Sequence, residues 1–410
     1  MRVLIFSQYF WPETFSINEL VKGLIEKGMD VDVLTGKPNY PEGSIYADYR
    51  AWGCQTEGWQ GATVYRIPLA PRGARNALRL AINYLSFILS GLVFAPWLLR
   101  RRNYRIIFVY APSPILQAIP ALFLGWLKGC PVVVWVQDLW PDTLESTGYI
   151  RNPHLIRLVG LVVRFIYRHT DLLMVPSKAF VKWVAALARH QRIEYYPNSV
   201  DPVFASPPEV ALPEVPGLTE GFSVLFAGNV GTLQAVHVIV EAATLLKDYP
   251  DVRFVVMGQG SRWEWMRQQV EARGLTNLYL PGRFPVEAMP GIMQKASVLL
   301  VTLLNQPIFA ATVPNKVQAY MAAGKPIVAC VNGEGARLVI EADAGLAAPA
   351  EDASALADAV LSLYRMTPQE RERLGANGRR YYEEQFNHDM LVEKLIQRFR
   401  AVSESAERSR

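Results

Sequence analysis

Glycine-rich turns that follow apolar runs are the strongest chemical signal in this chain of 410 residues. The first, AGNVGT, contains Gly228, Asn229, Gly231 and Thr232. Glycines let backbone N–H groups approach a phosphate, and a helix expected to start near Thr232 would add its positive end. A second turn, MGQGS at residues 257–261, has the same character. Glycines also close ordinary strand-to-helix turns, so either turn alone is equally compatible with a purely structural role.

The densest pattern is VPNKVQAYMAAGKPIV at residues 313–328, which is typical of a loop, a helix of small residues and a strand. Lys316 stands beside Asn315 near the expected start of that helix. An ammonium group and free backbone N–H groups together would suit a diphosphate. Further along the helix, Gln318 and Tyr320 could reach a ribose or a base.

Another turn, NGEGA at residues 332–336, could cradle a phosphate or a sugar with the main-chain donors of Gly333 and Gly335. The three cysteines are far apart and show no spacing typical of a zinc site. No D-x-D pattern follows an expected strand. We therefore expect a site of backbone amides and cations, with no metal ion and no cofactor. The chain also has no G-x-G-x-x-G pattern of the kind that a dinucleotide-dependent dehydrogenase needs.

Two series of short, β-rich apolar runs must position these turns. They alternate with segments of helical spacing, which predicts an α/β fold with parallel, doubly wound sheets. The runs are 2–6, 31–35, 105–110, 131–136 and 171–175 in the first half, and 222–228, 252–258, 278–282, 298–303 and 326–331 in the second. Such sheets bind ligands at the carboxyl ends of their strands, so we expect the active site in a cleft between two domains.

Length and composition agree with two domains, since a chain of this size exceeds one ordinary core. A content of 51% hydrophobic and 19% charged residues excludes extensive disorder. A proline-rich, acidic stretch predicts a linker at 204–220, between an N-terminal domain of residues 1–203 and a C-terminal domain of residues 221–386. The last helix, 387–403, follows the second sheet and is expected to pack back on the first domain.

The net charge is +5, and many first-half arginines flank one apolar segment, residues 80–99. Tyr84 and Trp97 lie near the ends of this segment. Three interpretations stay open: a helix that spans a membrane, a buried core helix, or a helix in the membrane interface whose flanking arginines bind lipid phosphates. We assign the positive charge to an anionic membrane surface and not to nucleic acid. Because the N-terminal run is typical of a strand and not of a signal peptide, we expect a cytoplasmic protein, peripheral on the inner face of the cell membrane.

Several short motifs, each weak alone, together resemble family-4 retaining glycosyltransferases over nearly the whole chain. They are PE at 12–13, LTGKPNYP at 34–41, VQDLWPD at 136–142, VPS at 175–177, PNSVD at 197–201, AGNVGT at 227–232, PGRFPVEAMP at 281–290 and YMAAGKP at 320–326. Within that family the chain looks most like enzymes of bacterial O-antigen, capsule and colanic-acid synthesis, particularly N-acetyl-fucosamine transferases. The resemblance implies a GT-B fold, in which two Rossmann-like domains face one another across a cleft.

The resemblance also implies the ligands. The donor diphosphate would lie near Gly231, Thr232 and Lys316, and the base near Gly282 and Arg283. A uridine diphosphate N-acetylated deoxyhexosamine is the expected donor. A polyprenyl-diphosphate-linked saccharide is the expected acceptor.

The chain departs from the family pattern at four positions. Where many relatives carry two glutamates eight positions apart, this chain has Ala311 and Ala319. Gln137 stands where relatives often carry a histidine, and Gln234 lies close to the position of an expected diphosphate-binding lysine. The usual acidic and imidazole roles therefore cannot be transferred.

Acidic residues in the first half are the catalytic candidates that remain. Asp138 or Glu13 would orient an acceptor hydroxyl, and Asp142 is an alternative. Equally, Asp138 could cap the following helix and Glu13 could be a solvated turn residue.

The expected reaction is a retaining transfer, in which amides and cations stabilise the leaving diphosphate. Two other functions stay open. A sugar-nucleotide 2-epimerase shares the architecture but should bring acids and histidines to the cleft, and none of the five histidines lies in an expected cleft turn. A non-catalytic subunit that binds nucleotide sugar would explain the absent glutamates and histidine.

Overall fold

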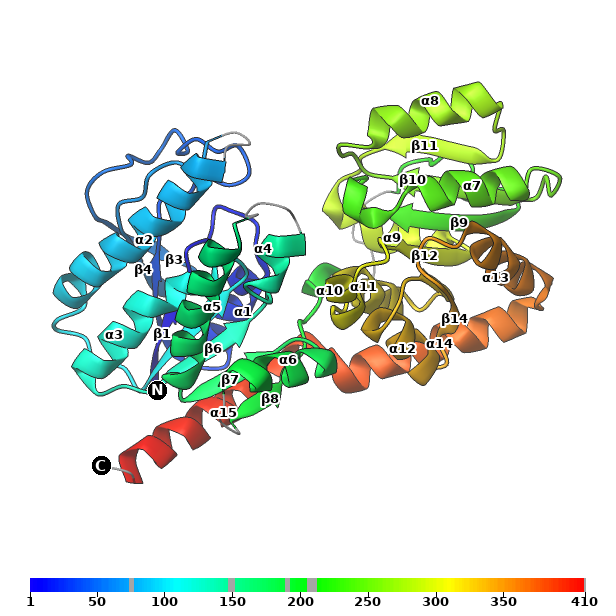
Figure 1. Cartoon of the computed structure of the whole chain (residues 1–410). Helices are drawn as coiled ribbons and strands as arrows, with labels where there is room; N and C mark the ends of the chain where they lie inside the picture. The colour runs from blue at the N-terminus through cyan, green and yellow to red at the C-terminus, as the bar shows by residue number, and fades with distance from the viewer. Residues whose placement is uncertain (74–76, 147–151, 189–191, 205–211, 409–410) are drawn as a thin grey trace. The chain divides into compact units, whose positions relative to one another are not determined.

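The computed structural model describes residues 1–73, 77–146, 152–188, 192–204 and 212–408. Contacts divide the chain into unit 1, Met1–Pro197 with His388–Arg410, and unit 2, Asn198–Asn387. Each unit is a sheet of mainly parallel strands with helices on both faces (Figure 1). The doubly wound α/β architecture predicted from the alternating runs is confirmed.

The division between the units precedes the boundary expected after residue 203. Part of the expected linker, residues 205–211, lies outside the described residues. Of the remainder, Val215 and Leu218 are buried in the core of unit 2. A Cβ on Gly217 would also collide with the ring of Tyr279. The segment that follows residue 211 is therefore an integral part of unit 2.

The sheet of unit 1 has the strand order β3-β4-β2-β1-β5-β6-β7-β8. Its strands are β1 Arg2–Phe6, β2 Asp30–Thr35, β3 Gln55–Trp59, β4 Ala62–Arg66, β5 Ile106–Ala111, β6 Val132–Val136, β7 Leu172–Val175 and β8 Ile193–Tyr195. All neighbours are parallel except β3 and β4. Central strands such as β5 and β6 are buried along their whole length, because helices cover both faces.

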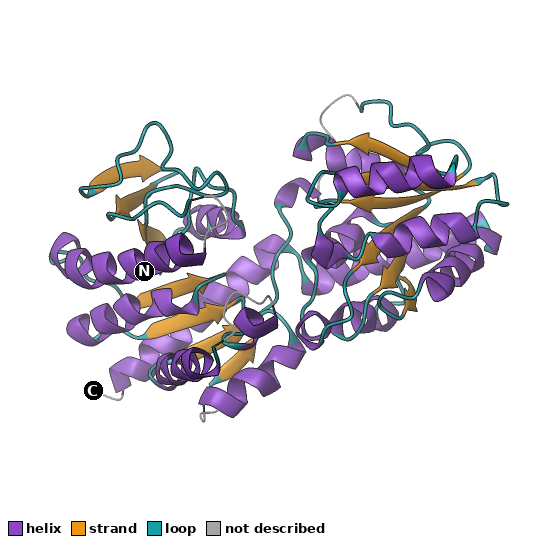
Figure 2. Ribbon diagram, turned by 45° about the horizontal axis from the view of Figure 1, so that its top comes forward, coloured by secondary structure: helices purple, strands orange, loops and turns teal. Residues whose placement is uncertain are grey.

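Helices lie on both faces of this sheet (Figure 2). Successive residues of β1 point to opposite faces of the sheet. Val3 and Ile5 pack in the core beneath α1 and α15. On the other face, the ring of Phe6 lies 5.8 Å from that of Phe87 in α2. The helices of unit 1 are α1 Ser16–Glu26, α2 Ala77–Leu98, α3 Ala118–Lys128, α4 Asp142–Ser146, α5 Pro153–Arg168, α6 Lys178–Ala188 and α15 His388–Arg408, with a 3₁₀ turn η1 at Ile115–Gln117.

Helix α15 completes the core of unit 1 although it follows unit 2 in the sequence. Its buried face includes Leu395 and Phe399, and the Phe399 ring lies 5.3 Å from that of Phe108 in β5. The hydroxyl of Tyr196 donates to the carbonyl of Leu391 at 2.9 Å. The final helix thus packs on the first domain.

The sheet of unit 2 is parallel throughout, with the order β11-β10-β9-β12-β13-β14. Its strands are β9 Phe222–Ala227, β10 Val252–Met257, β11 Leu278–Gly282, β12 Val298–Thr302, β13 Ile327–Cys330 and β14 Gly345–Ala348. Its helices are α7 His237–Leu245, α8 Trp263–Arg273, α9 Met289–Lys295, α10 Pro307–Ala311, α11 Asn315–Ala323, α12 Glu334–Glu341, α13 Ala353–Arg365 and α14 Pro368–Gln385. The 3₁₀ turns η2 Pro202–Phe204, η3 Thr232–Gln234 and η4 Val286–Ala288 complete it.

Helix α2 contains most of the apolar segment whose placement the sequence left open. Within the described residues it is the one helix long and apolar enough to cross a membrane, and 22% of its most apolar window is buried. One side, which includes Asn83, Phe87 and Gly91, is buried in unit 1. The opposite side is exposed and apolar, with Leu89 63% and Val93 65% exposed. An ordinary buried core helix is therefore the wrong interpretation.

Candidate functional site

Lys316 stands at the start of α11 and is partly exposed as a residue, but its side-chain nitrogen is buried. Its Nζ atom is inaccessible to solvent and has no hydrogen-bond partner among the described residues. The ammonium lies 3.6 Å from the centre of the Phe226 ring, and burial lowers its pKa to about 7. A Cβ on Gly228 would stand 2.7 Å from Lys316 Cε, so only glycine leaves room for the lysine here. A buried ammonium without a counter-charge is costly, and an anionic ligand would offset that cost.

The two glycine turns predicted to approach a phosphate lie against each other at the carboxyl ends of β9 and β10. The Gly228 N–H donates to Met257 O, and the Val230 N–H donates to Gln259 O, both at 2.9 Å. Gly258 has a φ of +135°, and a Cβ there would collide with the carbonyl oxygen of Gly228. Close approach of two backbones is thus a physical reason for glycine at this position.

The helix expected near Thr232 begins later. Thr232 opens only a three-residue 3₁₀ turn, because Ala235 adopts a left-handed conformation with φ of +46°, and α7 starts at His237. Asn229 Nδ2 donates to Gln234 Oε1 at 3.2 Å beside Gly231. The first turn therefore offers backbone and amide groups, but not the N-terminus of an α-helix.

Two further turns lie at the same edge of the sheet. Gly282 has a φ of +91° and ends β11, and its carbonyl accepts from the Gly258 N–H at 2.8 Å. Arg283, which follows it, is exposed. After β13, Gly333 has a φ of +70° at the start of α12, one residue before the buried Glu334 and two before Gly335. The predicted donor-binding residues of unit 2 thus follow the carboxyl ends of strands or begin α11.

The side chains of α11 differ in what they can reach. Gln318 is buried, and its Oε1 has no hydrogen-bond partner among the described residues. Asn315 is exposed and accepts from Asn198 Nδ2 at 3.1 Å. Tyr320 is fully buried in the core, and its hydroxyl bonds the N–H of Ala227 at 3.0 Å. The expectation that Tyr320 reaches a ribose or base is therefore wrong, since its hydroxyl fixes α11 to the end of β9.

Asp138 lies just beyond β6 in unit 1 and lines a cavity of about 500 Å³. Its carboxylate accepts from Thr143 Oγ1 at 2.5 Å and from Trp140 Nε1 at 3.2 Å. Burial raises its pKa, and these hydrogen bonds oppose the rise. The alternative acid, Asp142, lines a separate pocket beside Lys182. The two carboxylates therefore face different cavities.

Glu13 is 2% exposed and is not a solvated turn residue. Its Oε1 accepts from the N–H groups of Asn39 and Tyr40, both at 2.8 Å, and its Oε2 accepts from the N–H of Phe10 at 3.3 Å. Burial raises its pKa to about 7, and the three backbone hydrogen bonds oppose that rise. Glu13 thus holds the loop of Tyr40, a residue that lines the Asp138 cavity.

A buried amide network, which the motifs did not reveal, fixes the wall of this cavity. Gln8 Nε2 donates to Asn83 Oδ1 at 2.7 Å, and Asn83 Nδ2 donates to Asn39 Oδ1 at 3.3 Å and to Ala70 O at 2.7 Å. Gln8 also receives support from Gln117, whose Oε1 accepts from its N–H at 2.7 Å. The one available signal was Asn83, a polar residue within an apolar segment. Gln137, at the histidine position of the relatives, has a buried Nε2 without a partner among the described residues.

Both halves of the chain match families of known proteins. Residues 14–199 match the model described as "Glycosyl transferase 4-like domain", and residues 221–366 match "Glycosyl transferases group 1". The chain is 26% identical over 350 residues to WcaI of Escherichia coli strain K12, whose name assigns it to colanic acid biosynthesis. That similarity covers 79% of this chain and 82% of the relative.

Solved structures show the same fold over the whole length. Sucrose-phosphate synthase from Thermosynechococcus elongatus has a TM-score of 0.73 at 16% identity, over 98% of this chain and 99% of its own. Anabaena Alr3699/HepE in complex with UDP has a TM-score of 0.69 at 13% identity, over 98% of this chain and 100% of its own. With a glycosyltransferase 4-like domain followed by a group 1 domain, the protein is a glycosyltransferase of the GT-B fold and belongs to the family-4 type.

Proposed function

We propose that this glycosyltransferase moves a sugar from a nucleoside diphosphate to a polyprenyl-diphosphate-linked saccharide, with retention of configuration, in the synthesis of a bacterial surface polysaccharide. The observation that supports binding of the sugar donor is the buried ammonium of Lys316. It lacks an anionic partner among the described residues and lies against a glycine turn. The similarity to a relative named for colanic acid biosynthesis supports the pathway.

The donor diphosphate would bind at the carboxyl edge of the unit 2 sheet. The glycine turns at Gly228 and Gly258 lie together there, and the Lys316 side chain lies beside Gly228. The N–H groups of Gly228, Val230 and Gly258 are bonded within the fold, so the donors proposed for the diphosphate are the Lys316 ammonium and the other N–H groups of these turns, such as that of Gly231. Such groups are already oriented before the reaction, so they stabilise the charge that grows on the leaving diphosphate. UDP is the favoured nucleotide, because a structural neighbour binds it. The N-acetylated deoxyhexosamine is proposed on resemblance to N-acetyl-fucosamine transferases.

In unit 1, Asp138 is the group proposed to act on the acceptor. Its carboxylate faces the cavity and is fixed by Thr143 and Trp140, so it can orient an acceptor hydroxyl without moving. Glu13 holds the neighbouring loop through backbone hydrogen bonds and acts as a positioning residue.

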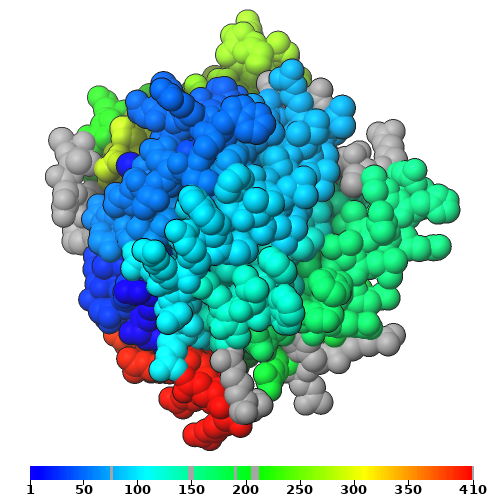
Figure 3. Space-filling view, turned by 90° about the vertical axis from the view of Figure 1, so that its left-hand side faces the viewer, coloured from blue at the N-terminus to red at the C-terminus, as the bar shows by residue number. Residues whose placement is uncertain are grey.

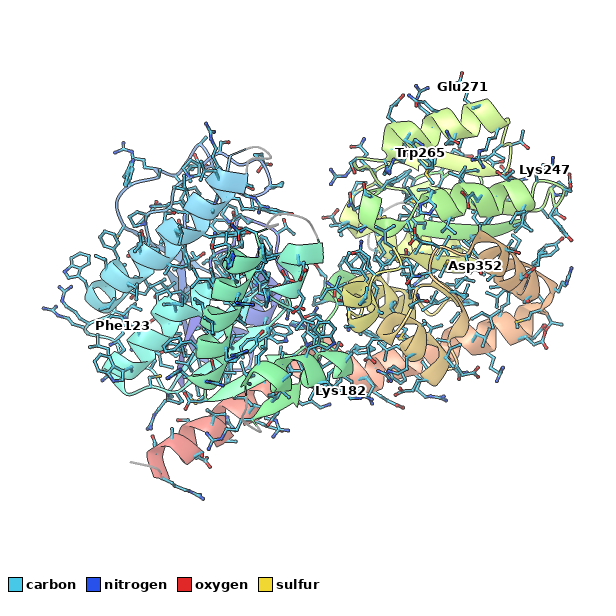
Figure 4. All side chains as sticks on the ribbon, viewed as in Figure 1. Phe123, Lys182, Lys247, Trp265, Glu271 and Asp352 are labelled. Carbon is cyan, nitrogen blue, oxygen red and sulfur yellow. The ribbon has the colours of Figure 1, made fainter. Side chains whose placement is uncertain are left out.

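The membrane surface is proposed from the apolar face, which we define as the exposed apolar side chains of α2, α3 and α5. These are Leu78, Ile82, Leu85, Leu89, Val93 and Trp97 of α2, Phe123, Trp126 and Leu127 of α3, and Leu155, Leu158, Leu161 and Phe165 of α5. Atoms of these three segments lie next to one another in Figure 3, and Phe123 points outward from α3 in Figure 4. So large an exposed apolar surface is typical of an interaction site.

The positive charge around the apolar face favours an anionic lipid surface as its partner. None of the three helices contains aspartate or glutamate. Exposed arginines follow α2 at Arg100 and Arg101 and lie within α5 at Arg157 and Arg168. Arginines around an apolar patch bind lipid phosphates while the patch enters the leaflet.

An interfacial position fits α2 better than a spanning one. Its inner side carries Asn83, which hydrogen-bonds to Gln8 and to Ala70 O, and Phe87, which packs on the sheet. A spanning helix would have to break these contacts and expose the amide to hydrocarbon. We therefore propose a protein that is peripheral on the cytoplasmic face of the membrane.

A transfer assay tests the reaction. Purified protein is mixed with radiolabelled uridine, guanosine and thymidine diphosphate sugars and bacterial membranes, and label is counted in extractable lipid. Label from one donor, lost in Lys316→Ala but kept in Lys295→Ala, an exposed lysine on α9, would support the proposal. Conversion of the donor into its C2 epimer, still linked to the nucleotide, would favour the epimerase. Tight binding of the nucleotide sugar with no transfer to any acceptor would favour the non-catalytic subunit.

Vesicle sedimentation tests the surface. The wild type should sediment with phosphatidylglycerol vesicles, and Leu89→Glu with Val93→Glu should weaken binding about tenfold, because two charges enter the apolar face. Leu245→Glu, an exposed leucine of unit 2, is the matched control. Equal sedimentation of both variants would rule out this surface.

A further inference from the structure

The cavity that contains Asp138 combines an apolar lining with two charges of opposite sign. Its volume of about 500 Å³ is in the range of small-molecule sites. Its walls come from α2, α5 and the segments that follow β1, β2, β4, β5 and β6, and leucines, alanines and aromatic residues dominate them.

Arg72 is the cation of this cavity. Its backbone N–H donates to Asn39 Oδ1 at 3.1 Å, and its guanidinium lies 5.2 Å from the centre of the Tyr40 ring. In the part of the chain that the structure describes, no ion pair occupies this guanidinium. A partly buried arginine that faces an apolar cavity is suited to a phosphate, to which it donates several N–H groups at once.

Tyr84 lies near both charged side chains of the cavity, Arg72 and Asp138. Its ring lies 6.3 Å from that of Trp140 and lines the same cavity as Arg72 and Asp138. Burial raises the pKa of Tyr84, Arg72 lowers it, and Asp138 raises it further, so both charges act on this phenol. A ligand that fills the cavity therefore meets a cation and a carboxylate.

The cavity opens on the apolar face. Leu85 of α2 and Leu155 of α5 both line it, and they are 54% and 43% exposed. Both also belong to the surface proposed to enter the leaflet. An apolar chain could thus pass between these leucines from the cavity into lipid without crossing water.

We propose that this cavity binds the diphosphate and the first isoprene units of the acceptor's polyisoprenyl carrier. The proposal rests on the transferase function. Arg72 pairs with the phosphates, the chain leaves between Leu85 and Leu155, and the sugar hydroxyl faces Asp138. The enzyme therefore recognises the lipid of its acceptor as well as the sugar.

Calorimetric titration of the full-length protein with farnesyl diphosphate, in the absence of any sugar donor, tests the cavity. Inorganic diphosphate and dihexanoyl phosphatidylglycerol are titrated in parallel, to separate isoprenyl recognition from phosphate or phospholipid binding. Ala81→Trp fills the cavity from an exposed position on α2, and Arg72→Gln removes the cation. Ile82→Trp, the next residue on the exposed side and not part of the lining, is the matched control.

We expect farnesyl diphosphate to bind at least tenfold more tightly than either comparison ligand. Ala81→Trp and Arg72→Gln should each weaken it at least tenfold, and Ile82→Trp less than twofold. Equal binding of inorganic diphosphate or the phospholipid, or unchanged binding by Ala81→Trp, would overturn the proposal. Normal transfer to lipid by Ala81→Trp would also overturn it, while leaving the transferase function intact. Farnesyl diphosphate binding with the expected variant effects, but without sugar transfer from any donor, would support the cavity and contradict the transferase.

Discussion

The carboxyl edges of the two sheets have the same strand-to-helix construction but offer different chemistry. In unit 2 the edge consists of glycine turns, such as those at Gly228 and Gly258, with one buried ammonium at Lys316. In unit 1 the edge is built from side chains, with Asp138 in an apolar cavity supported by an amide network. Backbone amides suit a phosphate, which all sugar nucleotides share. Side chains can be exchanged by mutation, so they suit the acceptor that we propose to bind in unit 1.

Two buried cations show the same contrast. Arg66 is fully buried, and it donates to Glu57 Oε1 and to Trp11 O, both at 2.5 Å. The Lys316 ammonium is buried without such partners among the described residues. A cation whose hydrogen bonds are complete stabilises the fold, whereas one without partners is available to a ligand.

The largest expected effect separates these two cations. Arg66→Met should lower the free energy of unfolding by about 4 kcal/mol, because it leaves Glu57 and the carbonyls of Trp11 and Gly36 without their partner. Lys316→Met should leave stability unchanged or raise it, yet lower kcat/KM about 100-fold or more, because it removes the cation proposed to bind the leaving diphosphate. Urea denaturation and the transfer assay measure both quantities. A strongly destabilised Lys316→Met would break the comparison.

Gly258→Ala tests the backbone character of the unit 2 edge. The added Cβ would collide with the carbonyl of Gly228 at a φ of +135°, so we expect a loss of about 3 kcal/mol in stability and a loss of UDP binding. Gly274→Ala is the control, because its φ is +58° but open space surrounds it, and it should cost about 1 kcal/mol. Calorimetry with UDP gives the binding result. Normal UDP affinity in Gly258→Ala would mean that these turns do not hold the donor.

Substitution of Glu13 should mainly change stability, whereas substitution of Asp138 should mainly change the rate of transfer. Glu13→Gln should lower stability by about 2 kcal/mol, since the amide NH₂ would face backbone donors. Asp138→Asn should change stability by less than about 1 kcal/mol but lower kcat about 100-fold. Thermal unfolding and transfer rates, measured on the same preparations, separate the two roles. The reverse pattern would assign catalysis to Glu13.

A dependence of stability and UDP binding on pH follows from the lowered pKa of Lys316. Burial lowers its pKa from 10.5 to about 7, so the unfolded chain binds one more proton than the folded chain between those values. This group therefore makes the free energy of unfolding rise with pH between about 7 and 10.5, and it adds no slope below about 7, where the lysine is protonated in both states. UDP, which needs the charged form, should bind more weakly as pH rises above about 7. Neither the pH dependence of stability nor that of UDP binding should remain in Lys316→Met. If either remains, it belongs to another titratable group.

The sequence predicted most strands, because the central ones are uninterrupted apolar runs in a parallel sheet. It did not predict β3, β4, β8 or β14. The residues of β3, QTEGW, alternate between partly and fully exposed at an edge, and β14, GLAA, lacks large apolar side chains. The edge strands β3, β8 and β14 are specified mainly by a neighbour that is distant in sequence, so local composition does not reveal them, whereas the missed strand β4 lies inside the sheet between β3 and β2.

The placement of the candidate donor-site residues in the fold was predictable where it depends on backbone turns and helix starts. The glycine turns and Lys316 were identified because each follows a strand or begins a helix. Tyr320 and the start of α7 were wrong, since the direction of a helical side chain and the left-handed Ala235 depend on packing. The contact of Asn83 with Gln8 joins residues 75 positions apart, which no local pattern contains.

Helix α15 has a consequence for how the protein is made. The ribosome releases the strands of unit 1 first, but the helix that covers Phe108 and receives the Tyr196 hydrogen bond is synthesised after the whole of unit 2. Until then an apolar side of the nascent first sheet remains uncovered and prone to association. Unit 2 is one continuous stretch of chain, so the domain encoded second can become fully native without α15, on which unit 1 depends.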